Sequence, residues 1–437
     1  MMSHPLIDVF SPMPPLQTEI ANHTAGVLQA LQHLARVRIW TAQEGPVELA
    51  AQDVELCRFR PDALPIAKLN EADATFYNFG NNAGFHRDIH RAAQRVPGII
   101  ILHDTRLQHF FAAYAEQPGK DRESYLAQLE RSHGPAVREM GEQFIAGQRG
   151  LQDMVQMAPM TLAALEGAIA AVLHNPEEKE ALEGRTHVPL YCLPLSSRFG
   201  PTPAHRPPRN ADMPSRLVMF GFIGENRRLL PILEVLAAMP DRDDYRLDVY
   251  GVVEQAVEAD ALVAASGLSS IVTRHGFVSE AQLDAALADA DLALNLRWPS
   301  MGEASATQLR IWAAACPALV MRVGWYAQLP PDTVFMIEPA QEREGIVTQL
   351  RALRRAPDLY ARAGAAGRRI LEQLHSPERY AEGLLAVASQ HAVQHARQVG
   401  YALAERAARF MLDLGSPEAA RLQGGEVGRR IAGLTSH

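Results

Sequence analysis

The chain has 437 residues, enough for two or three domains, and its formal net charge of −8 argues against a dedicated nucleic-acid binder. Its three cysteines are far apart and form no CxxC pair, so neither a disulfide framework nor a structural zinc site is expected. The N-terminus lacks the pattern of a signal peptide, and no apolar run approaches the roughly twenty residues of a membrane span. We expect a cytoplasmic protein and leave peripheral contact with the inner face of the cell membrane open.

The N-terminal half alternates short apolar runs with amphipathic segments. Strands are expected at residues 6–10, 37–40, 74–78, 98–102 and 171–174, with helices at about 18–34 and 83–95. Such alternation predicts a parallel sheet with helices on both faces. Residues 1–200 therefore form a first α/β domain, which carries a helical insertion at about 107–170.

A proline-rich stretch of low apolar content separates this half from a second alternating block. We assign residues 201–214 to a linker. Strands are then expected at 216–221, 245–250, 292–296 and 319–321, and helices at 227–239 and after the capping box that Ser279 begins. This gives a second α/β domain at 215–385 and a C-terminal helical extension at 386–437.

Open parallel sheets bind ligands at the carboxyl ends of their strands, so two such domains place the expected site in the cleft between them. The most informative stretch, residues 299–310, follows a buried strand and opens an apolar helix. Free N–H groups in the first turn of a helix favour phosphate oxygens. Glu303 in this turn could also bond sugar hydroxyls. The alternative is an ordinary strand-to-helix turn with an acidic residue.

The pattern around Glu303 resembles the donor site of glycosyltransferase family four, a retaining group with the GT-B fold, which places a Glu in a P-S-x-x-E turn. Residues 221–228 resemble that family's first strand and turn of the donor domain, where a basic residue holds the diphosphate. Residues 276–294 resemble its nucleobase-edge segment and the strand before the Glu turn, and residues 323–330 resemble a later turn of some bacterial members. Order and spacing match over most of residues 215–385.

The resemblance implies two Rossmann-like domains with parallel sheets facing an interdomain cleft, plus C-terminal helices. It also implies a nucleotide-diphosphate sugar, such as a UDP- or GDP-sugar, as the donor substrate, with no metal and no other cofactor. The donor-binding residues implied are Gly221, Arg227, Arg228, Val278, Ser305, Ala306 and Thr307.

His103 and Glu303 are the implied catalytic residues. His103 follows the strand at 98–102 and is expected to face the donor sugar across the cleft; the alternative is a packed histidine near the core. The implied acceptor-binding residues are Glu19, Asn22, Asn81, Asn82 and Asp104. For residues 79–82 the alternative is a turn rich in residues that tolerate left-handed backbone.

The sequence departs from the family pattern at two positions. Ile311 stands where the family has a second acid, and Phe222 where many members carry an arginine; Arg297 or Arg310 could supply further positive charge. We expect a retaining, hexosyltransferase-like enzyme that acts on a saccharide or lipid-linked saccharide, in surface polysaccharide or glycoconjugate synthesis. A catalytically impaired homologue that acts as partner or scaffold of an active transferase is the alternative. An epimerase or a phosphorylase is a third possibility. Residues 215–385 contain no lysine that could carry pyridoxal phosphate, which counts against a phosphorylase.

Two further patterns suggest metal sites. His86 and His90 lie one helical turn apart, and Asp241 and Asp243 form a D-x-D pattern. We expect the two histidines on a solvated helix face and the two aspartates in an exposed turn, so neither pattern predicts a metal. The oligomeric state does not follow from the sequence.

Overall fold

The computed structural model describes residues 4–115, 122–200 and 213–413, which divide into two compact units. Unit 1 comprises Met1–Leu193 and Pro377–His437, and unit 2 comprises Pro194–Ser376. Most of the expected linker, and the last part of the helical extension expected at 386–437, lie outside the described residues. Within the described ranges, no helix combines the length and the apolar character of a membrane span.

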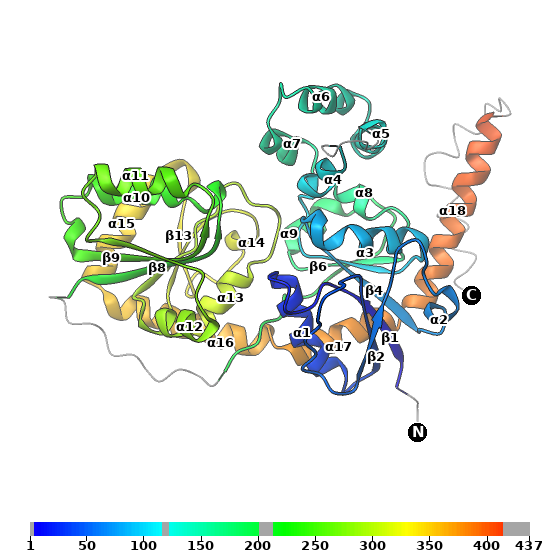
Figure 1. Cartoon of the computed structure of the whole chain (residues 1–437), viewed down its shortest axis with the longest axis horizontal. Helices are drawn as coiled ribbons and strands as arrows, with labels where there is room; N and C mark the ends of the chain where they lie inside the picture. The colour runs from blue at the N-terminus through cyan, green and yellow to red at the C-terminus, as the bar shows by residue number, and fades with distance from the viewer. Residues whose placement is uncertain (1–3, 116–121, 201–212, 414–437) are drawn as a thin grey trace. The chain divides into compact units, whose positions relative to one another are not determined.

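The sheet of unit 1 is parallel throughout, as predicted, with the strand order β3-β2-β1-β4-β5-β6-β7 (Figure 1). Its strands are β1 (Leu6–Phe10), β2 (Arg36–Thr41), β3 (Val54–Arg58), β4 (Ala74–Phe79), β5 (Ile99–Leu102), β6 (Ala170–Leu173) and β7 (Leu190–Cys192). Alternate side chains along each strand enter the two cores on opposite faces of the sheet. Phe76 belongs to one core, and the adjacent Tyr77 belongs to the other.

Helices cover both faces of this sheet, because central parallel strands are apolar on both sides. They are α1 (Glu19–Leu31), α2 (Ile66–Leu69), α3 (Ala83–Arg95) and α9 (Pro176–Leu182). The helical insertion consists of α4 (Gln108–Ala115), α5 (Arg122–His133), α6 (Ala136–Ile145), α7 (Leu151–Met157) and α8 (Thr161–Ala164).

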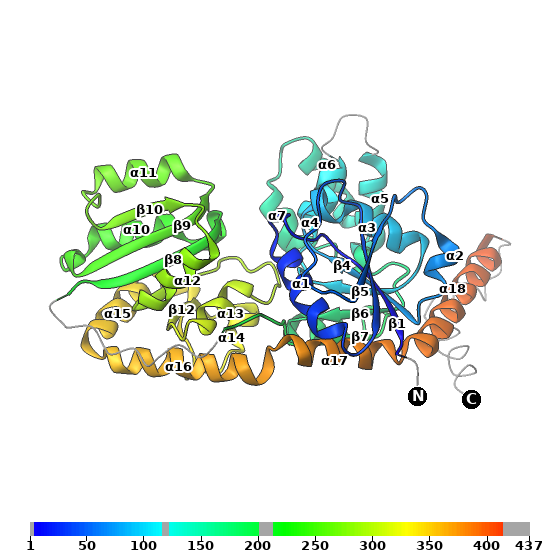
Figure 2. The same cartoon turned by 60° about the horizontal axis from the view of Figure 1, so that its bottom comes forward.

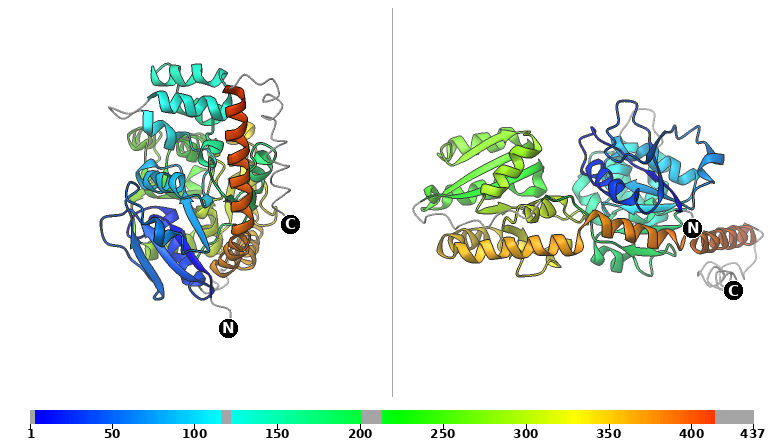
Figure 3. Two further views of the ribbon diagram at one scale, coloured as in Figure 1. Left: turned by 90° about the vertical axis from the view of Figure 1, so that its right-hand side faces the viewer. Right: turned by 90° about the horizontal axis from the view of Figure 1, so that it is seen from below.

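Two C-terminal helices return to unit 1. Helix α17 (Pro377–Ala388) packs on α1 and inserts Tyr380 and Leu384 into the core. The sequence-based boundary at residue 385 differs from this division, because the apolar face of α17 is buried in unit 1. Helix α18 (His391–Asp413) continues beside unit 1 as one straight helix (Figure 3).

Unit 2 has a second parallel sheet with the strand order β10-β9-β8-β11-β12-β13 (Figure 2). Its strands are β8 (Ser215–Ile223), β9 (Tyr245–Val253), β10 (Val272–Gly276), β11 (Leu292–Leu294), β12 (Ala318–Met321) and β13 (Phe335–Ile337). Its helices are η1 (Glu225–Arg227), α10 (Leu229–Ala238), η2 (Arg242–Asp244), α11 (Ala256–Ala265), α12 (Glu280–Asp289), α13 (Ala306–Ala313), α14 (Gly324–Ala327), η3 (Pro339–Gln341), α15 (Glu342–Arg355) and α16 (Pro357–Leu374).

The starts of two helices in unit 2 can be compared with the sequence. The capping box at Ser279 is confirmed: its hydroxyl accepts from the N–H of Gln282, whose side chain bonds back to Ser279. The continuous helix expected at 227–239 is wrong at its beginning. The short 3₁₀ helix η1 ends at Arg227, and Arg228 takes a left-handed conformation (φ 65°) before α10 starts.

A buried ion pair joins the neighbouring strands β1 and β2 of unit 1. Asp8 and Arg38 are register partners on β1 and β2, and their side chains form two hydrogen bonds of 2.6 and 2.9 Å. Both side chains are buried, and Arg38 also donates to the carbonyl of Lys68. The other carboxylate that Arg38 contacts is the exposed Glu71, at 3.0 Å, so removing Asp8 leaves the buried guanidinium without its buried partner.

We therefore expect Asp8→Ala to lower the free energy of unfolding by about 3–5 kcal/mol, measured by urea denaturation. Glu55→Gln is the matched control, because Glu55 forms an exposed pair with Lys68, and such pairs contribute less than about 1 kcal/mol. Similar losses in the two variants would contradict the assignment of Asp8.

Candidate functional site

In unit 2 the site begins where β8 and β9 end side by side. Gly221 and Gly251 are register partners, and both have positive φ (104° and 105°). A Cβ atom on Gly251 would lie 2.1 Å from the carbonyl oxygen of Gly221, so only glycine fits this close approach. The turn that follows carries Arg227.

Arg227 is 2% exposed and lies at the carboxyl end of β8. Its Nη2 donates to the carbonyl of Phe220 at 2.9 Å, while its Nε has no hydrogen-bond partner among the described residues. Burial lowers the pKa of Arg227 to about 9, and the positive charge of Arg297 acts in the same direction. Tyr326 and Glu303 oppose that shift only in part. Arg227 is thus a buried cation that is still protonated at neutral pH.

Glu303 lies on the loop between β11 and α13 and is also buried. Its Oε2 accepts from the N–H of Met301 at 2.8 Å, and its Oε1 lies 3.1 Å from Nη1 of Arg297. Ser305 caps α13 by accepting from the N–H of Gln308, so Ala306 and Thr307 form the first turn of that helix. The carboxylate is therefore held just ahead of a helix N-terminus.

The other basic side chains of this region are engaged elsewhere. Arg228 forms a bidentate pair with Glu342, at 2.8 and 2.6 Å. Arg310 pairs with Glu280 and Asp284 on α12. Of the four arginines named from the sequence, Arg227 and Arg297 are the two that interact with Glu303.

The two departures from the family pattern have different surroundings. Ile311 is 1% exposed and packs in the core of unit 2, whereas Phe222 is 67% exposed beyond the middle of β8. Val278 is partly buried and follows β10 directly, ahead of α12. Position 311 thus faces the core.

In unit 1, His103 immediately follows β5 and belongs to a cluster that the sequence did not predict. Its Nε2–H donates to Oδ1 of Asn78 at 2.8 Å. The ring of His103 lies 5.2 Å from that of His23 and 5.0 Å from that of His174. Tyr380 of α17 packs against both neighbouring rings. His103 is thus ordered by residues from four separate segments.

Two of these imidazoles, those of His103 and His23, have lowered pKa values. Burial lowers the pKa of His103 well below its usual range, and His174 and His23 add to the effect. Burial lowers the pKa of His23 to about 3, with a further contribution from His174. A neutral His103 that donates through Nε2 has an acceptor lone pair on Nδ1, the ring nitrogen suited to a hydroxyl donor.

The expected acceptor-binding residues are brought together only in part. The carboxylate of Asp104 accepts from the N–H of Asn81 at 2.9 Å, which joins the ends of β4 and β5. Asn82 caps α3 by accepting from the N–H of Gly84, a structural role. Glu19 and Asn22 are exposed on α1, and the helix expected from about residue 18 begins at Glu19.

The two metal-like patterns have structural explanations. The expectation of a solvated face for His86 and His90 is wrong: both are buried, because α3 turns them onto the sheet, where His90 stacks on Phe79. Burial lowers the pKa of each to about 4. Asp241 pairs with Arg351 in the turn before β9. Among the residues described, no group of three or more His, Cys, Asp or Glu side chains could hold a metal ion.

Comparisons with known proteins identify the fold. Neither a protein-family model nor a curated protein sequence matches the chain. Solved structures do match. They include sucrose-phosphate synthase from Thermosynechococcus elongatus (TM-score 0.60, 16% identity, 88% of this chain and 98% of that one). HepE from Anabaena in complex with UDP matches with a TM-score of 0.58 and 12% identity, over 88% of this chain and 100% of that one. The glycosyltransferase WaaG matches with a TM-score of 0.53 and 15% identity, over 86% of this chain and 98% of that one. The predicted GT-B fold, with two Rossmann-like domains and C-terminal helices, is confirmed.

The buried histidines of unit 1 predict how stability depends on pH. Their folded pKa values lie below the unfolded value near 6.5, so the unfolded chain binds more protons as pH falls through 6.5. The contribution of these neutral histidines to the free energy of unfolding is fully present above that pH. It is lost progressively toward pH 4, by about 1.4 kcal/mol per pH unit for each such histidine. Urea midpoints measured from pH 8 to pH 4 test this.

His90→Phe keeps an aromatic ring on Phe79 and removes the titrating group. We expect its pH dependence to be shallower by about one proton, whereas the exposed His33→Phe should keep the wild-type slope. Equal slopes for wild type and His90→Phe would contradict the prediction.

Proposed function

We propose that the chain is a glycosyltransferase that moves a sugar from a nucleotide-diphosphate sugar to an acceptor hydroxyl. The observation that carries this proposal is the buried guanidinium of Arg227, whose Nε has no partner among the described residues, near the Glu303 loop at the carboxyl edge of the sheet in unit 2. The fold adds support, because HepE, which shares it, binds UDP, UDP with glucose, and UDP-glucose.

Unit 2 supplies the groups that a nucleotide sugar requires. Arg227 and Arg297 would neutralise the charge that develops on the leaving diphosphate, together with the N–H groups of the first turn of α13. The carboxylate of Glu303, which Met301 and Arg297 hold in position, would accept hydrogen bonds from sugar hydroxyls. The close approach at Gly251 keeps the neighbouring backbone free of side chains.

We propose retention of the anomeric configuration by front-face displacement. The bond from the anomeric carbon to the phosphate oxygen breaks, and the bond to the acceptor oxygen forms on the same face. The acceptor proton passes to the departing phosphate oxygen, so no protein nucleophile and no metal take part. Membership of glycosyltransferase family four rests on the residue pattern at 299–310 and 221–228.

Unit 1 is proposed to hold the acceptor, with His103 serving the transferred sugar. Its neutral imidazole is oriented by Asn78, and its second nitrogen is available for a hydroxyl. The acceptor class proposed is a saccharide or a lipid-linked saccharide, in surface polysaccharide or glycoconjugate synthesis. WaaG, which shares the fold, is involved in lipopolysaccharide biosynthesis. A cytoplasmic location with peripheral membrane contact would suit such an acceptor.

A catalytically impaired homologue is the second candidate, and Ile311 favours it. An aliphatic side chain that is 1% exposed cannot replace an acid that binds a ribose. Such a protein would bind the nucleotide without turning over the sugar. Nucleotide binding and sugar turnover, measured on the same sample, distinguish the two candidates.

Arg227→Ala is expected to weaken UDP or GDP binding by roughly ten-fold or more, because a charge-assisted contact to phosphate contributes about 1.5–3 kcal/mol. Titration calorimetry measures the affinity. Arg228→Ala is the matched control and should change affinity far less, since Arg228 is already paired with Glu342. Arg227→Ala also removes the hydrogen bond to the carbonyl of Phe220, so the melting temperatures of both variants are measured to separate a loss of stability from a loss of affinity. Unchanged affinity in Arg227→Ala would refute the role of this residue.

Glu303→Gln keeps the shape of the side chain and removes its charge, and His103→Ala removes the oriented imidazole. Each should lower turnover by about 10²-fold or more, the effect of losing one positioned polar group, with smaller changes in nucleotide affinity. Asp243→Asn, in an exposed turn, is the control and should turn over normally. Normal turnover of both site variants would overturn the assignment.

Metal independence is tested by chelation. Because Arg227, Arg297 and the N-terminus of α13 are proposed to balance the diphosphate charge, turnover in excess EDTA should equal that of the untreated enzyme. A loss of activity that Mn²⁺ or Mg²⁺ restores would contradict this mechanism and return attention to Asp241 and Asp243.

A further inference from the structure

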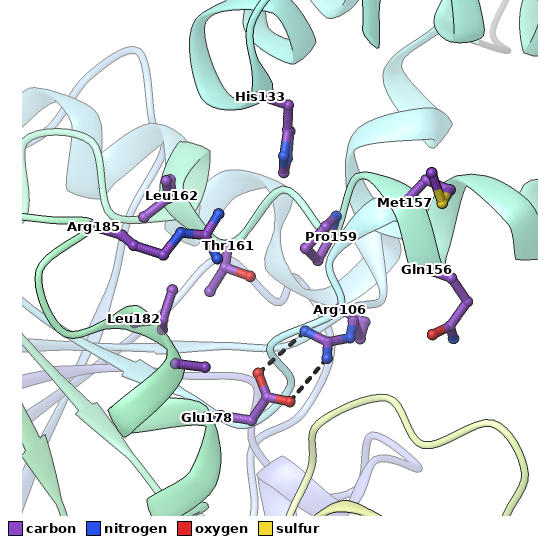
Figure 4. A pocket seen from close by; sticks show the side chains of 11 residues that line it. Arg106, His133, Gln156, Met157, Pro159, Thr161, Leu162, Glu178, Leu182 and Arg185 are labelled. Carbon is purple, nitrogen blue, oxygen red and sulfur yellow. Dashed lines mark hydrogen bonds and ion pairs between the residues drawn. The ribbon is translucent and has the colours of Figure 1, made fainter.

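Unit 1 contains a cavity of about 290 Å³ beside the segments that carry His103 and His174 (Figure 4). Arg106 lies three residues after His103, and Glu178 lies on α9, four residues after His174. The helical insertion supplies the opposite wall. The lining residues are Arg106, His133, Gln156, Met157, Pro159, Thr161, Leu162, Glu178, Ala181, Leu182 and Arg185.

The walls of this cavity are tied together by hydrogen bonds. Thr161 Oγ1 donates to the carbonyl of Thr105 at 2.5 Å, which fixes α8 against the segment after β5. The N–H of Met160 donates to Nε2 of His133 at 3.3 Å, which fixes the end of α5. Arg106 and Glu178 form a bidentate pair, with contacts of 3.0 and 3.2 Å. The cavity is therefore shaped before any ligand enters it.

The charges that line the cavity do not balance. Glu178 is the one carboxylate among the lining residues, and it compensates Arg106. Arg185 is exposed and forms no ion pair with any residue that the structure describes. The pKa of His133 is lowered, first by burial and then by the positive charge of Arg185. The positive charge of Arg185 thus remains uncompensated on this side of the cavity, next to the imidazole of His133.

We propose that this cavity binds an anionic group, a phosphate or a carboxylate, carried by the acceptor saccharide. The volume is just below the range of about 300–1,000 Å³ for ligand pockets, so a ligand no larger than a single sugar residue suits it. Arg185 would contact the anion directly, and His133 would donate to it through Nδ1. The assignment of the anion to an acceptor rests on the proposed glycosyltransferase function.

The test measures the affinity of glucose 6-phosphate by titration calorimetry, with glucose as the uncharged probe. Arg185→Gln should weaken binding of glucose 6-phosphate by about ten-fold, the effect of losing one charge-assisted contact. Glu178→Gln should instead tighten it, because it removes the carboxylate that competes for Arg106. The control is Arg131→Gln, which makes the same charge change on α5 at an exposed residue outside the cavity lining, near Glu166.

Three outcomes would overturn the proposal. Equal affinities for glucose and glucose 6-phosphate would show that the anion is not recognised. Equal affinities of Arg185→Gln and Arg131→Gln for glucose 6-phosphate would exclude the cavity. Loss of binding in Arg227→Ala alone would place the phosphate in unit 2.

The same samples are titrated with UDP and GDP, which tests the proposed function separately. Nucleotide binding together with opposite effects of Arg185→Gln and Glu178→Gln supports the proposal. If neither nucleotide binds while these opposite effects persist, the assignment to an acceptor is overturned along with the function.

Discussion

Parallel pairing is the constraint on which both halves of this protein depend. Every strand of a parallel sheet ends at the same edge, so each polar residue placed just after a strand joins the others there. His103 follows β5 and Arg227 follows β8, while Glu303 stands on the loop after β11. Because the strands themselves are apolar, these residues are polar groups at the rim of a core, where burial strengthens their electrostatic interactions.

The strands and helices that the sequence predicted are those with a strong apolar pattern. Central strands such as β4 and β5 are buried on both faces; β5 is a continuous apolar run, and β4 is mostly apolar apart from Thr75 and Asn78. All four edge strands were missed: β3 and β10 have mostly exposed side chains, and β7 and β13 are only three residues long. The burial of His86 and His90 was missed because their polar rings face a core whose aromatic residues come from other elements.

The sequence named candidate site residues that stand in local motifs, but not the distant residues that hold those side chains in place. Residues such as Glu303 and Arg227 stand in local patterns that a linear reading can match. Asn78 and Tyr380, which surround His103 and its neighbours, come from β4 and from a helix that returns to unit 1 nearly three hundred residues later. Contacts between residues so far apart in the chain produce no local sequence pattern from which they could be predicted.

Arg227 differs from a structural arginine in what surrounds it. A buried guanidinium normally has a carboxylate partner, because an unpaired buried charge is costly. Arg38 in unit 1 satisfies that rule with Asp8, at 2.6 Å. Around Arg227, the carboxylate of Glu303 is already engaged by Arg297 and by the N–H of Met301. Arg227 itself forms no ion pair within the part of the chain that the structure describes, and its Nε has no hydrogen-bond partner there, so an anionic ligand is the group that would suit this site.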